Sequence, residues 1–404
     1  MYPDRLYDLA LTFRKTKLWK RLYDSELFAV SLSNGQIAYC CIMGLLGEHI
    51  ALAVYIGEQG LDSYRHLQEM GHVPMNALQA QEFMLSQSCL QCSLETKDTL
   101  SPQELAAARG YGKTHGITFR GANAFPQFIK YQPARYPWPV QETADIQLLC
   151  EALTAALEVS EKLATVDKGR LGFTDGPAHD RTIPLLTPEG QGFTWGVCRL
   201  PPRWPASYPE PVLLDKLLTA RLKKQKKRAG IWACDVVMFP QPVVVDEDNT
   251  DAAPVFPYML LAANLETELV IPTEVVPDYE EGAAEMLFAI GNRMLENGIP
   301  AEIHVVNDRT RSLLKNLAAA LGIHLVQRQE IELLDSLEEE LLDYCDEQTP
   351  DTVEEAADYF SEMLLSLDND VLLSMPKDLQ KQLQAMERQG LLAEDVANRI
   401  RNLF

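Results

Sequence analysis

Residues 302–326 read EIHVVNDRTRSLLKNLAAALGIHLV, and they predict a strand, a helix and a second strand in immediate succession. Apolar runs at 302–306 and 323–326 flank a segment with helical periodicity at 309–321, which ends before Gly322. Two strands joined in this way are expected to lie parallel in one sheet, connected by a right-handed crossover. The stretch therefore predicts a mixed α/β domain around it.

The elements on either side extend this domain. Strands are predicted at 231–245, 258–263 and 269–275, followed by a helix at 279–296, and a further helix follows at 333–344. Three strands in succession imply hairpins, so the sheet combines antiparallel and parallel pairs. The expected order is strand, strand, strand, helix, strand, helix, strand, helix.

The first part of the chain predicts a separate α+β domain. Its expected elements are a helix at 4–23, strands at 27–32, 37–43 and 50–56, a helix at 61–70, a strand at 82–94, a short helix from the Ser101 and Glu104 capping box to Gly110, a helix at 144–164 and a hairpin at 183–200. We predict an α+β protein with an N-terminal domain at 1–165, a second α/β domain at 166–347 and an acidic helical tail at 348–404.

The composition is typical of a globular cytoplasmic protein. Apolar residues make up 47% of the 404 residues and charged residues 23%, which excludes a disordered or collagen-like chain. Apolar runs are shorter than the roughly 18 residues that span a bilayer, and the first residues do not resemble a secretory signal. The eight cysteines have no regular spacing and include adjacent Cys40 and Cys41, which indicates thiols in a reducing compartment. We expect a cytoplasmic protein without membrane contact.

Charge is divided unevenly along the chain. Residues 1–228 contain 26 basic and 23 acidic side chains, whereas residues 229–404 contain 10 and 35, so the net charge of −22 lies in the second part. Such acidity repels nucleic acid and favours a partner protein with a basic surface, although solvated helix faces have the same composition.

A segment with the opposite character lies at residues 105–141, which contain five basic and seven aromatic side chains and no acid. Single-stranded nucleic acids and nucleotides are bound by this combination, because rings stack on bases and cations pair with phosphates. A proline-rich loop that packs over a core would have the same composition. The candidate ligand-binding residues are Arg120, Lys130, Tyr131, Arg135 and Trp138.

Two short motifs resemble a phosphate-binding loop and a metal site, and their context excludes both. Gly112-Lys113-Thr114 resembles the end of a phosphate-binding loop, but Ala107 stands where the first glycine is required and the segment follows a helix. Cys89 and Cys92 form a lone CxxC pair on a predicted strand, where residues three apart point to opposite faces. The sequence therefore predicts no metal site and no cofactor from these motifs.

The order of elements over 231–344 is similar to that of the ribonuclease H-like fold. Members that cleave nucleic acid hold two divalent ions with carboxylates from the first strand, the first helix, the end of the fourth strand and the last helix. The resemblance implies Asp235, Glu280, Asp308 and Asp335 as candidate catalytic residues. Asp308 equally fits a helix N-cap, and Asp335 lies in an acid-rich helix.

Asp235 is unusual because it shares its predicted strand face with apolar residues. We expect its carboxylate to be held by backbone donors or by a base such as Arg309 or Arg311. In that case the second domain has the order of elements of the ribonuclease H-like fold but not its metal-dependent catalysis.

Three short runs at 257–261, 298–300 and 321–323, which read PYMLL, GIP and LGI, resemble a domain of unknown function found in uncharacterised bacterial proteins. That family implies no activity, cofactor or catalytic residue. The sequence thus predicts a binding or protein-interaction protein rather than an enzyme, with a divalent-metal-dependent nuclease or a nucleic-acid-binding or nucleotide-binding protein as the alternative.

Overall fold

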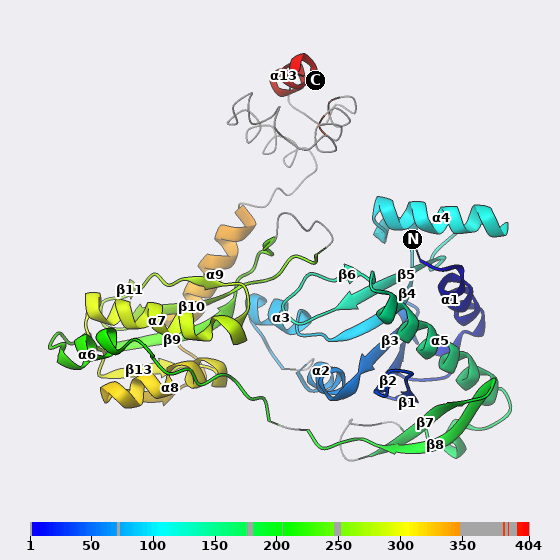
Figure 1. Ribbon diagram of the computed structural model, residues 1–404, viewed down its shortest axis with the longest axis horizontal. Helices are drawn as coiled ribbons and strands as arrows, with labels where there is room; N and C mark the ends of the chain where they lie inside the picture. Colours follow the sequence, from blue (N-terminus) through cyan, green and yellow to red (C-terminus); the bar gives the residue numbers. More distant parts are fainter. Residues whose placement is uncertain are drawn as a thin grey trace. The chain divides into compact units, whose positions relative to one another are not determined.

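The computed structural model describes residues 2–70, 73–174, 176, 181–203, 205–245, 252–347, 383, 387 and 394–403. The chain divides into two compact units, Met1–Leu334 and Asp335–Phe404. The first unit contains two β-sheets with helices packed against them (Figure 1). The predicted α+β class with two mixed domains is confirmed.

The first sheet has eight strands among the described residues, in the order β6-β5-β4-β3-β2-β1-β7-β8. The strands are β1 (Phe28–Ser31), β2 (Ile37–Met43), β3 (Ile50–Ile56), β4 (Cys89–Glu95), β5 (Phe125–Tyr131), β6 (Trp138–Pro139), β7 (Thr182–Glu189) and β8 (Gly192–Arg199). Neighbouring strands are antiparallel except β1 and β7, which are parallel. The β7–β8 hairpin, which the sequence assigned to the second domain, therefore completes the first sheet.

Both faces of this sheet are buried. Helices α1 (Asp4–Thr16) and α5 (Thr143–Leu163) pack on one face, around Phe13, Phe28 and Leu153. Helix α2 (Gly57–Met70) covers the other face. Cys89 and Cys92 belong to the apolar clusters on opposite faces of β4, as their spacing on a strand predicts.

Helices α1, α3 and α4 differ most from the elements that the sequence predicts. Helix α1 ends at Thr16 because Lys17 adopts a left-handed conformation, so the predicted helix to residue 23 was too long. Helix α3 (Ala77–Met84) occupies the start of the predicted strand 82–94, because Asn76 and Gln79 form a capping box. Helix α4 (Pro102–His115) continues past Gly110 to a left-handed Gly116.

The second sheet has the order β11-β10-β9-β13-β14, and β12 also pairs with β10. Its strands are β9 (Ile231–Met238), β10 (Tyr258–Asn264), β11 (Leu269–Val270), β12 (Val275–Val276), β13 (Glu302–Val305) and β14 (His324–Gln327). β9 is antiparallel to β10 and parallel to β13, which is parallel to β14. The quoted stretch 302–326 thus forms the expected parallel strand–helix–strand unit.

Helices α6 (Lys216–Lys224), α7 (Tyr279–Asn297) and α8 (Asp308–Leu321) pack around one apolar core with this sheet. Two predicted strands are shorter in the structure. β9 ends before Pro240, and the predicted third strand is divided at Pro272, because proline donates no ladder hydrogen bond.

Helix α9 spans Glu332–Glu347 and helix α13 spans Glu394–Leu403. Most of the predicted tail at 348–404 lies outside the described residues. In the part of the chain that the structure describes, no helix is both long enough and apolar enough to cross a membrane.

Candidate functional site

The end of α4 and the loop that follows it form the wall of a cavity. Ser101 caps the start of the helix, and Gly116 ends it with a φ of +66°. The chain then folds back against the helix at Gly112, where a Cβ atom would lie 2.6 Å from the Ile117 carbonyl oxygen and 3.0 Å from the Phe119 ring. Gly112, part of the excluded phosphate-loop motif, therefore permits the close approach that shapes this cavity.

We call this space the α4 cavity; it has a volume of about 430 Å³. Its lining residues are Lys97, Arg109, Lys113, Ile117, Thr118, Phe119, Gly121 and Phe125. Three of these side chains are cationic and none is acidic. The Phe119 and Phe125 rings stack with their centroids 5.1 Å apart.

The cations of the α4 cavity are available to a ligand. Arg109 and Lys113 are exposed, and among the described residues neither forms an ion pair. Lys97 lies 4.0 Å from Asp98, with both side chains largely exposed, and such surface pairs contribute little. The cavity therefore presents positive charge beside aromatic carbon.

Most of this cavity is formed by residues 105–141, which the sequence predicted to bind a ligand, but none of the five candidate residues lines it. Because the predicted helix stopped at Gly110, Arg109 and Lys113 were assigned to different elements. They lie four residues apart on one helix and so face the same side. The four-residue spacing was the available signal, whereas nothing in the sequence linked Lys97 to this segment.

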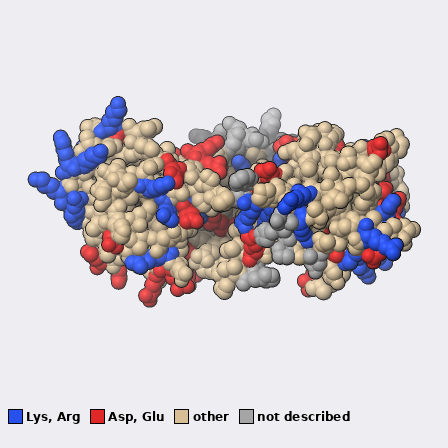
Figure 2. All heavy atoms as spheres, turned by 90° about the horizontal axis from the view of Figure 1, so that it is seen from below, with Lys and Arg blue, Asp and Glu red and all other residues tan. Residues whose placement is uncertain are grey.

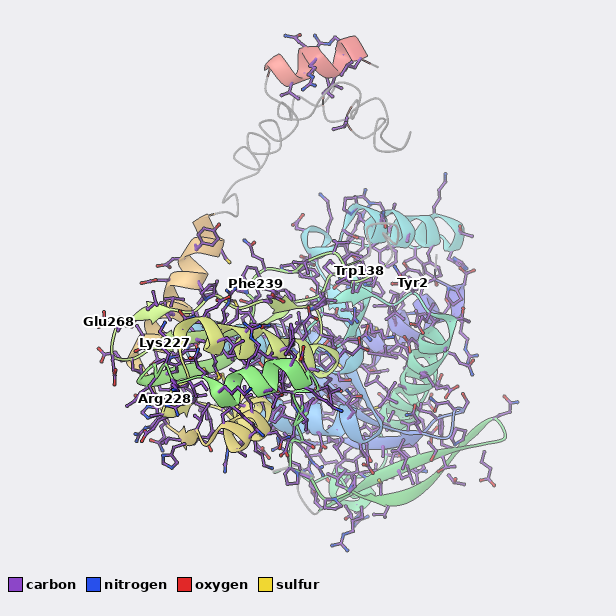
Figure 3. All side chains as sticks on the ribbon, turned by 60° about the vertical axis from the view of Figure 1, so that its left-hand side comes forward. Tyr2, Trp138, Lys227, Arg228, Phe239 and Glu268 are labelled. Atoms are coloured by element: carbon purple, nitrogen blue, oxygen red, sulfur yellow. The ribbon has the colours of Figure 1, made fainter. Side chains whose placement is uncertain are left out.

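The five predicted ligand-binding residues do not form one site. Lys130, Arg135 and Trp138 line a separate cavity of about 200 Å³ at the edge strand β6. Trp138 of this strand is labelled in Figure 3. Tyr131 alternates with Lys130 along β5 and packs against the apolar cluster of the α2 face. Arg120 is exposed, in the loop next to the α4 cavity.

Lys130 forms ion pairs within the protein. Its Nζ lies 2.7 Å from Asp145 and 3.4 Å from Glu142. Burial lowers the pKa of Lys130, but hydrogen bonds and charge from these two carboxylates raise it more, so the pKa lies above its ordinary value. Because two acids also line the β6 cavity, it is less suited to an anion than the α4 cavity.

The predicted carboxylates are also dispersed. Asp235 is buried on β9, whereas Glu280 and Asp308 are exposed at the starts of α7 and α8. Asp335 is half-buried on α9. Asn307, not Asp308, caps α8, since its side chain accepts the hydrogen bond from the Thr310 amide. Among the described residues, no group of three side chains could hold a metal ion.

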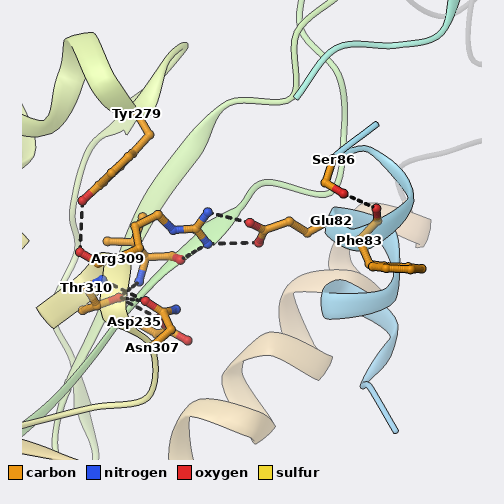
Figure 4. A network of polar contacts seen from close by, with 9 residues as sticks. Glu82, Phe83, Ser86, Asp235, Tyr279, Asn307, Arg309 and Thr310 are labelled. Atoms are coloured by element: carbon orange, nitrogen blue, oxygen red, sulfur yellow. Dashed lines mark hydrogen bonds and ion pairs between the residues drawn. The ribbon is translucent and has the colours of Figure 1, made fainter. Parts of the chain in front are cut away.

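Asp235 is held by neutral side chains (Figure 4). Its Oδ1 accepts hydrogen bonds from the Thr310 hydroxyl, at 2.8 Å, and from the Asn307 amide. Arg309 forms its ion pair with Glu82 and Arg311 donates to Gln327, whereas the charge of Asp235 contributes to the raised pKa of Arg309. Burial of this carboxylate is therefore explained by hydrogen bonds from α8 and its cap.

Arg309 joins the two sheets of the first unit. Its guanidinium donates to both oxygens of Glu82 on α3, at 2.5 and 3.0 Å, and to the Val236 carbonyl at 2.7 Å. It also lies over the ring of Tyr258, 4.9 Å from the centroid. Sequence reasoning missed this pair because it placed Glu82 in a strand; the capping box at Asn76 was the signal for the helix.

Comparison with known families adds two matches. Residues 4–176 match the family described as Domain of unknown function (DUF7309), and residues 218–342 match Domain of unknown function (DUF6930). The chain therefore combines two domains of unknown function, which confirms the resemblance drawn from the runs at 257–261, 298–300 and 321–323. No curated protein and no solved structure matches the chain. The likeness to the ribonuclease H-like fold remains a likeness in the order of elements.

Proposed function

We propose that this chain is a binding protein whose first domain binds a phosphate-bearing ligand with an aromatic base, either a nucleotide or a single-stranded nucleic acid, in the α4 cavity. The observation that carries the proposal is the composition of the lining: three cations and two phenylalanine rings, without a carboxylate. No reaction is assigned to the site.

Each kind of lining residue has a distinct role in this proposal. Arg109 and Lys113, side by side on α4, would pair with phosphate oxygens, and the guanidinium of Arg109 can do so with two parallel hydrogen bonds. Phe119, which is half-buried, offers a ring to a base, and such stacking is worth about 1–3 kcal/mol. The volume of about 430 Å³ is suited to a ligand of nucleotide size.

The test compares two double variants that remove the same charge. Arg109→Ala/Lys113→Ala removes two of the three cations of the α4 cavity, and Arg221→Ala/Lys224→Ala removes an arginine and a lysine from α6. Basic side chains gather at the end of the first unit formed by α6 (Figure 2). The α6 variant therefore controls for diffuse attraction to any basic surface.

Fluorescence anisotropy with labelled oligothymidylate and a labelled adenine nucleotide gives the affinities. The proposal predicts at least a tenfold loss of affinity for the α4 variant and less than a twofold change for the α6 variant. Equal losses in both variants, or flat titrations of the wild-type protein at low salt, would refute it.

We further propose a cytoplasmic location and a partner protein with a basic surface. The eight cysteines are buried and form no disulfide among the described residues, which supports a reducing compartment. Helix α9 supports the partner, since Glu332–Glu347 contains eight acids and no base. Pull-down across a salt series tests the partner: binding should weaken with salt, because exposed charges are screened. Capture that is insensitive to salt would refute the charge-based partner.

A further inference from the structure

A second basic cavity adjoins the first, between α1 and α4. We call it the α1 cavity; it has a volume of about 550 Å³ and shares Ile117 with the α4 cavity. Arg14, Lys15 and Lys17 supply its cations. Its one acidic residue, Asp8, accepts a hydrogen bond from the Tyr111 hydroxyl.

The end of α1 concentrates these three cations. The helix ends at Thr16, and the left-handed Lys17 turns the chain so that Leu18 and Trp19 enter the core. Lys15 and Lys17 are exposed, and among the described residues neither they nor Arg14 form an ion pair. The helix dipole places only about half a negative charge at this end, so the surface remains positive.

We infer that the ligand is a single strand that crosses Ile117 and occupies both cavities, rather than a mononucleotide confined to one. This inference rests on the function proposed above. The two cavities together present cations from the end of α1, from α4 and from Lys97, and Ile117 lines both cavities. A linear chain of phosphates can contact both groups, whereas the phosphates of one nucleotide are adjacent and would contact one.

An anionic lipid surface would also attract these cations, but α1 is not available for insertion. Its apolar side, formed by Leu6, Tyr7, Ala10 and Phe13, is buried in the core of the first sheet. Membrane-surface helices instead insert their apolar side into the lipid. The structure therefore favours the nucleic acid.

The experiment measures affinity for thymidine mononucleotide and for oligothymidylates of increasing length. Arg14→Gln/Lys15→Gln keeps much of the side-chain length while removing two charges from the α1 cavity. The inference predicts that wild-type affinity rises at least tenfold from the mononucleotide to the longer strands. The double variant should lose most of this gain and bind the mononucleotide as the wild type does.

The outcomes separate the two claims. If all lengths bind equally tightly, or if Arg14→Gln/Lys15→Gln has wild-type affinity for every length, the extended strand is refuted while a nucleotide in the α4 cavity stands. If Arg109→Ala/Lys113→Ala leaves every affinity unchanged, the proposed function itself fails. The last measurement uses vesicles that contain phosphatidylserine. If the protein binds these vesicles but none of the oligothymidylates, the inference is overturned. Circular dichroism confirms that each variant is folded.

Discussion

Glu82 of α3 and Arg309 of α8 form a two-pronged ion pair across 227 positions of sequence. Burial lowers the pKa of Arg309, but the charge and hydrogen bonds of Glu82 raise it more, so the guanidinium stays charged. The pair connects the first sheet's domain to the carboxyl end of β9 in the second sheet. Gln81 on the same helix as Glu82 adds a second link, since its side-chain amide donates to the Pro240 carbonyl at 2.6 Å.

Loss of this pair should destabilise the protein. The side chain of Arg309 is 12% exposed and that of Glu82 is 29% exposed, so removing one partner leaves the other poorly solvated. We expect Glu82→Gln to lower the free energy of unfolding by about 1–3 kcal/mol. Urea denaturation measures this, with the exposed Glu280→Gln as control, for which about 0.5 kcal/mol or less is expected.

A double-variant cycle gives the sharper result. Because Arg309 and Glu82 contact each other directly, the effects of Glu82→Gln and Arg309→Gln should not add. Additive effects would mean that the two side chains do not interact in solution.

Asp235 provides a second stability prediction. Asp235→Ala removes the acceptor of the Asn307 amide and one of the two acceptors of the Thr310 hydroxyl, so a loss of about 1–3 kcal/mol is expected. The exposed Asp308→Ala should change stability by about 0.5 kcal/mol or less. Thermal or urea unfolding compares the two variants.

The same variants test the nuclease alternative. Calorimetric titration with Mg²⁺ and Mn²⁺ would support a metal-dependent nuclease if the wild type bound metal stoichiometrically and both variants lost it while remaining stable. A destabilised Asp235→Ala with unchanged metal titrations is the result that we expect.

The buried tyrosines predict a loss of stability at alkaline pH. Burial, with a further contribution from the charge of Glu104, raises the pKa of Tyr7 to about 12. The ordinary value is 10.0, so the unfolded chain releases this proton first as the pH rises. Stability contributed by the neutral phenol is therefore complete below pH 10 and decreases between pH 10 and 12.

Tyr7→Phe isolates this contribution. Urea denaturation at pH 9, 10 and 11 should show a shallower decline for the variant than for the wild type. Parallel declines would show that Tyr7 does not have a raised pKa.

The thiols give a chemical prediction. Burial raises the pKa of Cys89 to about 12 and that of Cys92 further above its ordinary value. Thiolates are the reactive form, so both residues should react slowly with a disulfide reagent at pH 8 in the folded protein. All eight cysteines should react rapidly in denaturant, and fast labelling of Cys89 in the folded protein would contradict its burial.

The second sheet was predictable because its elements carry local signals. Alternating apolar residues and the glycine after α8 define the unit at 302–326, and the structure has the expected strands and helix. Element ends were less predictable. The left-handed Lys17 and the continuation of α4 through Gly110 depend on tertiary packing, which outweighs local propensity.

The site was predictable only as a segment. Residues 105–141 were identified by composition, but which of their cations are free depends on partners outside that segment. Asp145 and Glu142 pair with Lys130, whereas Arg109 has no such neighbour among the described residues. Likewise, nothing in the sequence around Arg309 indicated that its ion-pair partner is Glu82, which belongs to the domain of the first sheet.

The salt dependence of affinity tests the central claim, that the cations of the α4 cavity bind phosphate, most directly. Each phosphate contact on a single strand contributes about 0.7 to the slope of log affinity against log salt concentration. We predict that Arg109→Ala/Lys113→Ala makes the slope for a long oligothymidylate shallower by about 1.4, while Arg221→Ala/Lys224→Ala keeps the wild-type slope. Identical slopes for the wild type and the α4 variant would show that Arg109 and Lys113 do not contact phosphate, and the proposed site would be wrong.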